Sequence, residues 1–178
     1  MKLYHRVPKI LKYDSLMPLN KLEHIEKALF DENNWKYLHR LELKKKVIPY
    51  LNCLWNDVIH MTPVHPSQIK SALESRGLYY DSRTKWFEIC PETCGLTSEN
   101  SVIFHYSSTI SSCIDANDEE FTRFAPHKLQ GLGELRQEVL DYYAACKTSN
   151  QHPMTFHKVP HVQFKGELPI TTLKVIEV

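Results

Sequence analysis

Apolar residues recur at helical spacing in the first part of the chain. Leu22, Ile25 and Leu29 lie three and four positions apart, which is the spacing of one helix face. Asn20 precedes them and is a residue type that commonly caps a helix N-terminus. The pattern therefore predicts a helix over residues 20–30.

Three later segments carry similar patterns. Their apolar positions are Trp35, Leu38, Leu41 and Val47; Ile69, Ala72 and Leu73; and Leu135, Val139 and Tyr142. The first of these segments must end before Pro49, because proline breaks a helix interior. The second has the clearest limits, since Pro66 suits the first helical turn and Gly77 suits the position after the last. We expect a helix in each segment.

Short apolar or alternating runs predict the strands. They cover residues 2–7, 58–62, 86–89, 101–106, 162–165 and 173–178. Pro8 and Pro63 end the first two runs, because proline cannot donate to a strand ladder. The last two runs flank a turn at Gly166 and are expected to form a terminal strand pair. Residues 107–112 are rich in Ser and Thr, residues 118–120 are acidic, and both segments are expected to form exposed loops.

Helices and strands follow one another without a repeating order, which is typical of an α+β fold. No linker or low-complexity tract divides the 178 residues. A chain of this length can bury a sizeable hydrophobic core, so it needs neither disulfides nor a structural metal ion to fold. We therefore expect a single domain over residues 1–178.

The charges of the chain are closely balanced. Lys and Arg number 22 and Asp and Glu number 21, which gives a formal net charge of +1. This balance argues against long-range steering towards nucleic acid or anionic membranes. The ten histidines leave the true charge dependent on how each imidazole is buried or paired.

The cysteine count and the N-terminal residues both indicate the cellular compartment expected for the protein. Five cysteines cannot all pair, so free thiols in a reducing, cytoplasm-like compartment are expected. Residues 1–9 alternate polar and apolar side chains and lack the apolar core of a signal peptide. No apolar run reaches the ~18 residues of a membrane span.

Two histidines on predicted strands are candidates for a binding site. His5 lies in the middle of the first strand, with Tyr4 and Arg6 on the opposite face. His60 shares a strand face with Thr62. Each histidine also has a structural interpretation, because buried histidines commonly satisfy neighbouring backbone groups.

Three segments resemble the ADP-ribosyltransferase superfamily, in particular its toxin-like members. The N-terminal Leu3-Tyr4-His5 with the following Leu16-Met17-Pro18-Leu19 is similar to the opening strand and loop of that family. Residues 56–66 resemble the second-strand region near the nicotinamide. Residues 159–169, continuing through Ile176, resemble the closing strand pair.

The resemblance implies two small twisted sheets flanked by helices, with NAD bound as a substrate between them. The matching positions imply that the dinucleotide is held by Tyr4, His5, Arg6, His60 and Thr62, with His5 donating to the ribose hydroxyls. The acceptor of the ADP-ribose group would be a protein, a nucleic acid or water.

The chain departs from the family at the catalytic position. The family places a glutamate on the late strand, where it stabilises positive charge on the ribose as nicotinamide leaves. The matching residue here is His161, and Glu167 lies six positions later. His161 and Glu167 are therefore the two catalytic candidates, and His161 predicts slow or absent transfer.

Two other functions stay open. A non-catalytic protein-binding module of the same fold would keep the cleft without the carboxylate. A zinc-dependent hydrolase would use pairs such as His157 with His161, Cys90 with Cys94, or His60 with His65. The first two pairs would share a face only on a helix, and they lie in segments predicted as strand or loop. We therefore predict no metal site.

Overall fold

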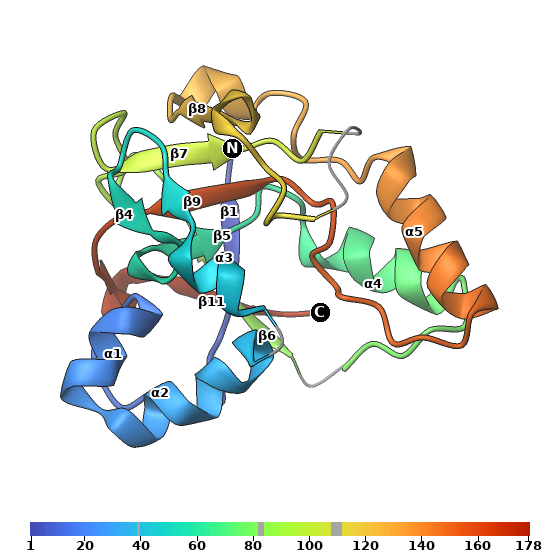
Figure 1. The fold of residues 1–178 in the computed structure, drawn as a ribbon, viewed down its shortest axis with the longest axis horizontal. Coiled ribbons are helices and arrows are strands. Elements are labelled where there is room, and N and C mark those ends of the chain that lie inside the picture. The colour runs from blue at the N-terminus through green and yellow to red at the C-terminus, as the bar shows by residue number, and fades with distance from the viewer. Residues whose placement is uncertain (39, 82–83, 108–111) are drawn as a thin grey trace.

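Two antiparallel sheets meet at the N-terminal strand in the computed structural model, which describes residues 1–38, 40–81, 84–107 and 112–178 (Figure 1). The three-stranded sheet has the order β1-β6-β11, with bounds Leu3–Arg6, Lys85–Ile89 and Lys174–Glu177. The four-stranded sheet has the order β5-β9-β7-β8, with bounds Ile59–Met61, His161–Phe164, Ser101–Phe104 and Phe121–Arg123. Tyr4 and Thr62 join the sheets by a single β-bridge.

Two short antiparallel strand pairs complete the strands. β10 (Leu168–Pro169) pairs with β2 (Ser15–Leu16), and β3 (Val47–Ile48) pairs with β4 (Cys53–Leu54). The described α-helices are α1 Leu19–Ile25, α2 Lys27–Asn34, α3 Leu41–Lys45, α4 Pro66–Glu74 and α5 Gln137–Thr148. Single 3₁₀ turns are η1 Trp35–Tyr37, η2 Trp55–Asp57, η3 Asp118–Glu120, η4 Pro126–Leu129 and η5 Ile170–Thr172. The prediction of a mixed α+β fold is confirmed.

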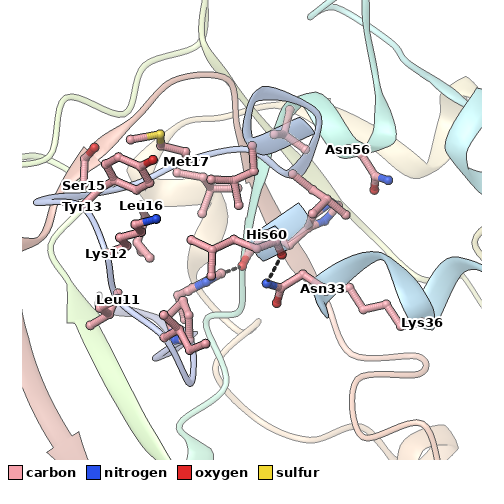
Figure 2. Close-up of a pocket in the computed structure, with 18 of the residues that line it drawn as sticks. Leu11, Lys12, Tyr13, Ser15, Leu16, Met17, Asn33, Lys36, Asn56 and His60 are labelled. Carbon is pink, nitrogen blue, oxygen red and sulfur yellow. Dashed lines mark hydrogen bonds between the residues drawn. The ribbon is translucent and has the colours of Figure 1, made fainter. Parts of the chain in front are cut away.

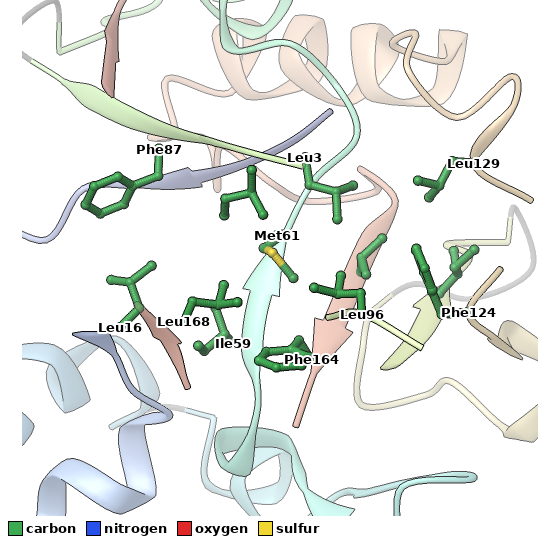
Figure 3. Packing of buried hydrophobic residues seen from close by; sticks show 13 residues of the cluster. Leu3, Leu16, Ile59, Met61, Phe87, Leu96, Phe124, Leu129, Phe164 and Leu168 are labelled. Atoms are coloured by element: carbon green, nitrogen blue, oxygen red, sulfur yellow. The ribbon is translucent and has the colours of Figure 1, made fainter. Parts of the chain in front are cut away.

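The apolar core lies between and around the two sheets. One cluster fills the space where the sheets face each other, and Figure 3 shows Met61 of β5 at its centre, near Leu3 of β1. Along β7, Ile103 belongs to this cluster, whereas Val102 and Phe104 pack in a second cluster on the opposite face of the strand. Both faces of β7 are covered, which explains why the strand is apolar almost throughout.

A third apolar cluster joins α4 and α5, which lie together on the right in Figure 1. Pro66 occupies the first turn of α4, and His65 accepts a hydrogen bond from the backbone N–H of Ser67 as its N-cap. Gly77 follows the helix with a φ of 63°, a backbone conformation that glycine adopts without steric cost. The predicted start of this helix at Pro66 is confirmed, and the helix ends at Glu74, before Gly77. None of the described helices has the length and apolar character needed to cross a bilayer.

The prediction of one continuous helix over residues 20–30 is wrong, because the segment forms two helices. Glu26 has an extended backbone with φ −153° and ψ 79°, and it separates α1 from α2. Its carboxylate pairs with Lys12, which fixes this break against the preceding loop. Ile25 remains 46% exposed, so part of the apolar stripe is not buried and does not hold a single helix together.

The helix predicted from Trp35 to Val47 is also interrupted. The segment forms η1, α3 and the strand residue Val47 in β3, and position 39 lies outside the described residues. Trp35, Leu38 and Leu41 remain exposed, whereas Tyr37 and Leu43 are buried. The buried face therefore differs from the predicted one, because tertiary packing selects different residues for burial.

Two further predictions need correction. The strands of the terminal pair belong to different sheets, because β9 pairs with β5 and β7 while β11 pairs with β6. After Gly166 the chain first forms β10, which pairs with β2, and then continues to β11 in the three-stranded sheet. In the acidic run, Glu120 is buried, and it accepts hydrogen bonds from Asn117 N and Ser107 Oγ. The other predicted loop extends over residues 108–111, which lie outside the described residues.

Candidate functional site

A pocket opens where β1 and β5 separate. The two strands are joined by backbone hydrogen bonds of 2.8 and 3.0 Å between Tyr4 and Thr62, and His5 and His60 follow on the diverging side. The cavity has a volume of about 170 Å³. The segment around residues 8–19, together with side chains of α1, α2 and η1, forms the opposite wall (Figure 2).

His5 lines this pocket and has a defined tautomer. Its Nδ1 lies 2.7 Å from the backbone oxygen of His60, and a carbonyl oxygen can only accept. Nδ1 therefore donates. Burial lowers the pKa of His5 to about 4, so at neutral pH its Nε2 is an unprotonated acceptor. The expectation that His5 donates to a ligand is corrected to one in which it accepts.

His60 lies beside His5 and is fixed by backbone and side-chain partners. Its Nε2 donates to the backbone oxygen of Trp55 at 2.9 Å, and Gln163 Nε2 lies 3.4 Å from its Nδ1. The imidazole also contacts the Trp55 ring, with centroids 4.9 Å apart. Burial, assisted by the neighbouring His161, lowers the pKa of His60 to about 3. His60 lines the pocket as a neutral side chain.

His161 of β9 lies behind His60. The ring centroids are 6.2 Å apart, and His161 is not among the residues that line the cavity. Burial lowers its pKa to about 4, and its Nδ1 is buried without a hydrogen-bond partner in the described part of the chain. The structure therefore brings His5, His60 and His161 together as an uncharged cluster at neutral pH.

The other predicted ligand-binding residues lie outside the cavity lining. Tyr4 is buried with its ring edge against His65 at 4.9 Å. Arg6 is exposed and donates to Thr84 Oγ1 at 3.0 Å. Thr62 Oγ1 accepts from the backbone N–H of Val64 at 3.1 Å, so it stabilises the turn after β5.

Glu167 lies at the rim of the site. It forms an ion pair with Lys21, and Ser15 Oγ lies 3.4 Å from its Oε2. Ser15 lines the pocket, whereas Glu167 is exposed and is not part of the lining. The carboxylate is therefore near the cavity and is held by its own partners.

Asn56 was not among the site candidates that the sequence indicated. Asn56 lies in η2, is only 2% exposed and lines the pocket. Neither its Oδ1 nor its Nδ2 has a hydrogen-bond partner in the described structure. Its neighbour Asp57 has a role in the turn, because it accepts from Leu54 N and Asn20 Nδ2, both at 2.7 Å. A polar residue two positions before the predicted strand was the available signal.

The charged side chains of the lining are basic. They are Lys12, which pairs with Glu26, and Lys36, whose ammonium lies 5.4 Å from the centre of the Tyr37 ring. No carboxylate belongs to the cavity lining among the described residues. Polar, uncharged groups from His5 and His60 are thus combined with the ammonium group of Lys36, which suits a ligand with a neutral end and an anionic part.

The zinc hypothesis has no preformed centre in the structure. Within the described ranges, no group of three or more His, Cys, Asp or Glu side chains is arranged to hold a metal ion. His157 is instead 3.2 Å from the Tyr106 hydroxyl, and the backbone N–H of Cys94 donates to the oxygen of Cys90.

Comparisons with known proteins leave the family open. No protein-family model, curated protein or solved structure matches this chain.

Proposed function

We propose that this protein is ADP-ribosyltransferase-like and binds the nicotinamide–ribose end of NAD in the pocket between β1 and β5. The observation that carries the proposal is the position of His5 and His60. They come from the two strands that resemble the family, are joined by a hydrogen bond of 2.7 Å, and open on the same cavity.

Several features of the pocket suit this ligand. The free Nε2 of His5 can accept a hydrogen bond from a ribose hydroxyl, which is both donor and acceptor. The apolar side chains Leu16 and Leu29 offer surfaces against a planar ring, and Lys36 offers positive charge to a phosphate group. A cavity of about 170 Å³ is smaller than typical pockets for drug-sized ligands, so the rest of the dinucleotide would lie across the rim.

Transfer would break the bond between the nicotinamide nitrogen and the ribose carbon. Nicotinamide leaves with the bonding electron pair, while a lone pair of the acceptor forms the new bond and the acceptor loses its proton. Positive charge develops on the ribose, and a carboxylate stabilises such charge. His161 is neutral and lies behind His60, and Glu167 lies at the rim. We therefore expect binding with slow transfer.

A non-catalytic binding module is the second candidate. The observation that favours it is the cavity lining, which contains no carboxylate in the described part of the chain. Such a module would keep the cleft for contact with a partner protein and would release no nicotinamide.

Calorimetric titration of the purified protein with NAD tests the proposal. We expect saturable binding that His5→Ala weakens by about 5- to 150-fold, which corresponds to losing one hydrogen bond in a largely desolvated site. His127→Ala is the matched control, because His127 is exposed and does not line the pocket. Failure of NAD to bind at millimolar concentration would overturn the proposal.

A nicotinamide-release assay separates the two candidates. Slow release that Glu167→Gln abolishes would identify the transferase and assign the carboxylate to Glu167. The absence of both NAD binding and nicotinamide release supports the protein-binding module. Fast release that is unaffected by Glu167→Gln would contradict the expectation of slow transfer.

A further inference from the structure

Three large apolar side chains are exposed on the η1 turn and at the start of α3. Trp35, Leu38 and Leu41 have exposed fractions of 69%, 60% and 56%. The Leu38 N–H donates to the Trp35 oxygen at 3.1 Å, and side chains three residues apart lie on the same edge of such a 3₁₀ turn. Leu41 follows three residues later, so its Cα lies within about 11 Å of the Leu38 Cα. We call these three side chains the η1–α3 surface.

The η1–α3 surface is held in place by the residues beside it in sequence. Tyr37 and Leu43 are buried in the second apolar cluster and fix the segment to the core. Arg40 donates from Nε and Nη2 to the Lys36 backbone oxygen at 3.1 and 2.8 Å, which ties the residue before α3 to the η1 turn. Because more than half of each apolar side chain is exposed on this fixed support, the side chains project from the molecular surface.

Cations without acidic partners flank the apolar side chains. Residues 35–46 contain five Lys or Arg and one Glu, a formal charge of +4 in a chain whose total is +1. The Lys36 ammonium and the Arg40 guanidinium lie 5.4 and 5.5 Å from the centre of the Tyr37 ring, and Lys44 lies 5.6 Å from the centre of a second aromatic ring. None of these three cations forms an ion pair with a carboxylate of the described residues.

An apolar projection flanked by cations fits the interface of a bilayer that contains anionic lipids. Tryptophan and leucine side chains enter the boundary between headgroups and acyl chains, while Lys and Arg contact the anionic headgroups. A fluid bilayer receives projecting side chains without a complementary groove, which a folded protein partner would need. Nucleic acid would contact the cations and stack on Trp35, but it would leave the two leucines in water. The combination of side chains therefore favours a membrane.

We propose that the η1–α3 surface docks this protein on membranes that contain anionic lipids. Trp35, Leu38 and Leu41 enter the interface, and Arg40 and Lys44 contact the headgroups. The docking is peripheral and reversible, because three side chains bury little apolar area. The balanced total charge limits attraction over long distances, whereas these cations act within a Debye length of about 8–10 Å. Docking goes beyond the proposed function and does not require NAD.

Trp35 provides a direct reporter of docking. The chain has three tryptophans, and the other two, Trp55 and Trp86, are only 5% and 2% exposed. The test titrates the protein with phosphatidylcholine vesicles that contain phosphatidylserine and records tryptophan emission. We expect a shift to shorter wavelength that high salt reverses, and at least about 10-fold weaker binding to phosphatidylcholine alone. Lipids brominated along the acyl chain should quench this emission.

Matched variants locate the docking surface. Leu38→Ser combined with Leu41→Ser keeps the reporter and should weaken vesicle binding by about 10-fold, because apolar contact is lost. Tyr79→Ser is the control, since Tyr79 is 68% exposed elsewhere on the molecule. Lys44→Gln should weaken binding by about 5-fold. Lys70→Gln, which removes another cation over an aromatic ring, should not change it. Each variant should keep the wild-type melting temperature, which separates docking from folding.

Contrary results identify other occupants. If vesicles with phosphatidylserine leave the emission unchanged, the proposal is wrong. A shift produced instead by a single-stranded oligonucleotide or an acidic polypeptide would assign the surface to that polyanion. A shift that appears with rising protein concentration, together with dimers in sedimentation, would assign it to a second copy of the chain. Vesicle binding that the double leucine variant leaves intact would show that another face docks, and it would also overturn the proposal.

Discussion

At the residue scale, the main feature of this protein is a set of imidazoles held neutral by burial. His5, His60 and His161 lie on three strands of two sheets, and the pKa of each is lowered to about 4, 3 and 4. His5 and His60 use one ring nitrogen to donate to a backbone carbonyl. Protonation would place a charge in a poorly solvated site, so the cluster acts as a source of neutral hydrogen-bonding groups.

Stability should therefore fall in acid. An unfolded histidine has a pKa of ~6.5, so between pH 6.5 and about 4 the unfolded chain binds more protons than the folded protein. The free energy of unfolding then decreases as pH falls, by up to about 1.4 kcal/mol per pH unit for each histidine that stays neutral. The stabilisation is fully present above pH 6.5.

Urea unfolding at pH 7.0, 5.5 and 4.5 measures this effect. Replacing His161 by Gln should reduce the slope between pH 6.5 and 4.5, whereas replacing the exposed His127 by Gln should leave it unchanged. A free energy of unfolding that is constant across this range would show that the imidazoles protonate in the folded state.

At the element scale, the pocket results from short elements that end where the chain must turn. β1 and β5 share one bridge and then diverge, and the broken helices α1 and α2 contribute Leu22, Leu29 and Asn33 to the opposite wall. β9 carries His161 and Gln163 behind the pocket and ends at a turn that leads into β10. The position of this turn decides which side chains of β9 support His60.

Substituting Gly166 tests how closely that turn packs against the core. A Cβ at this position would lie 2.5 Å from Cζ and 2.8 Å from Cε1 of Phe164, whose ring packs in the core between the sheets. Gly166→Ala should lower the free energy of unfolding by about 1–3 kcal/mol, because the ring or the turn must shift.

Gly133→Ala is the control for this substitution. A Cβ there meets Pro63 O at 3.6 Å, an ordinary contact, so the change should be neutral or stabilise by about 0.4–1 kcal/mol through the unfolded state. Thermal and urea unfolding of both variants give the comparison. Equal stabilities would mean that the Phe164 ring adapts at little cost.

At the scale of the whole molecule, the fold depends on apolar packing and hydrogen bonds without covalent cross-links. Three apolar clusters hold the sheets to each other and the helices to the sheets. All five cysteines are free, with Cys53 and Cys146 buried. Burial raises the pKa of the Cys53 thiol to about 11, so this thiol is protonated at neutral pH.

Thiol titration checks this description. Protein unfolded without reductant should yield five thiols, and the native protein should react more slowly at Cys53 and Cys146, because a buried neutral thiol is a poor nucleophile. Cys53→Ser and Cys146→Ser should each remove one slow thiol. A total of three or one in the unfolded protein would instead indicate disulfide formation.

The sequence alone determined the elements whose limits are set by local chemistry. Proline and glycine define α4, and alternating or continuous apolar runs define β1, β5, β6 and β7, because chain breakers and side-chain periodicity act over a few residues. It also predicted the α+β class and indicated the strand histidines His5 and His60 as site candidates.

Tertiary structure alone decided which face of each segment is buried and which side chains meet. Trp35 and Leu38 have the spacing of a buried stripe but are exposed, since the neighbouring strands cover Tyr37 and Leu43 instead. Asn56 was not a candidate from the sequence and lines the pocket, because strands far apart in sequence separate there. Burial and hydrogen-bond partners are contacts between distant segments, and no local pattern encodes them.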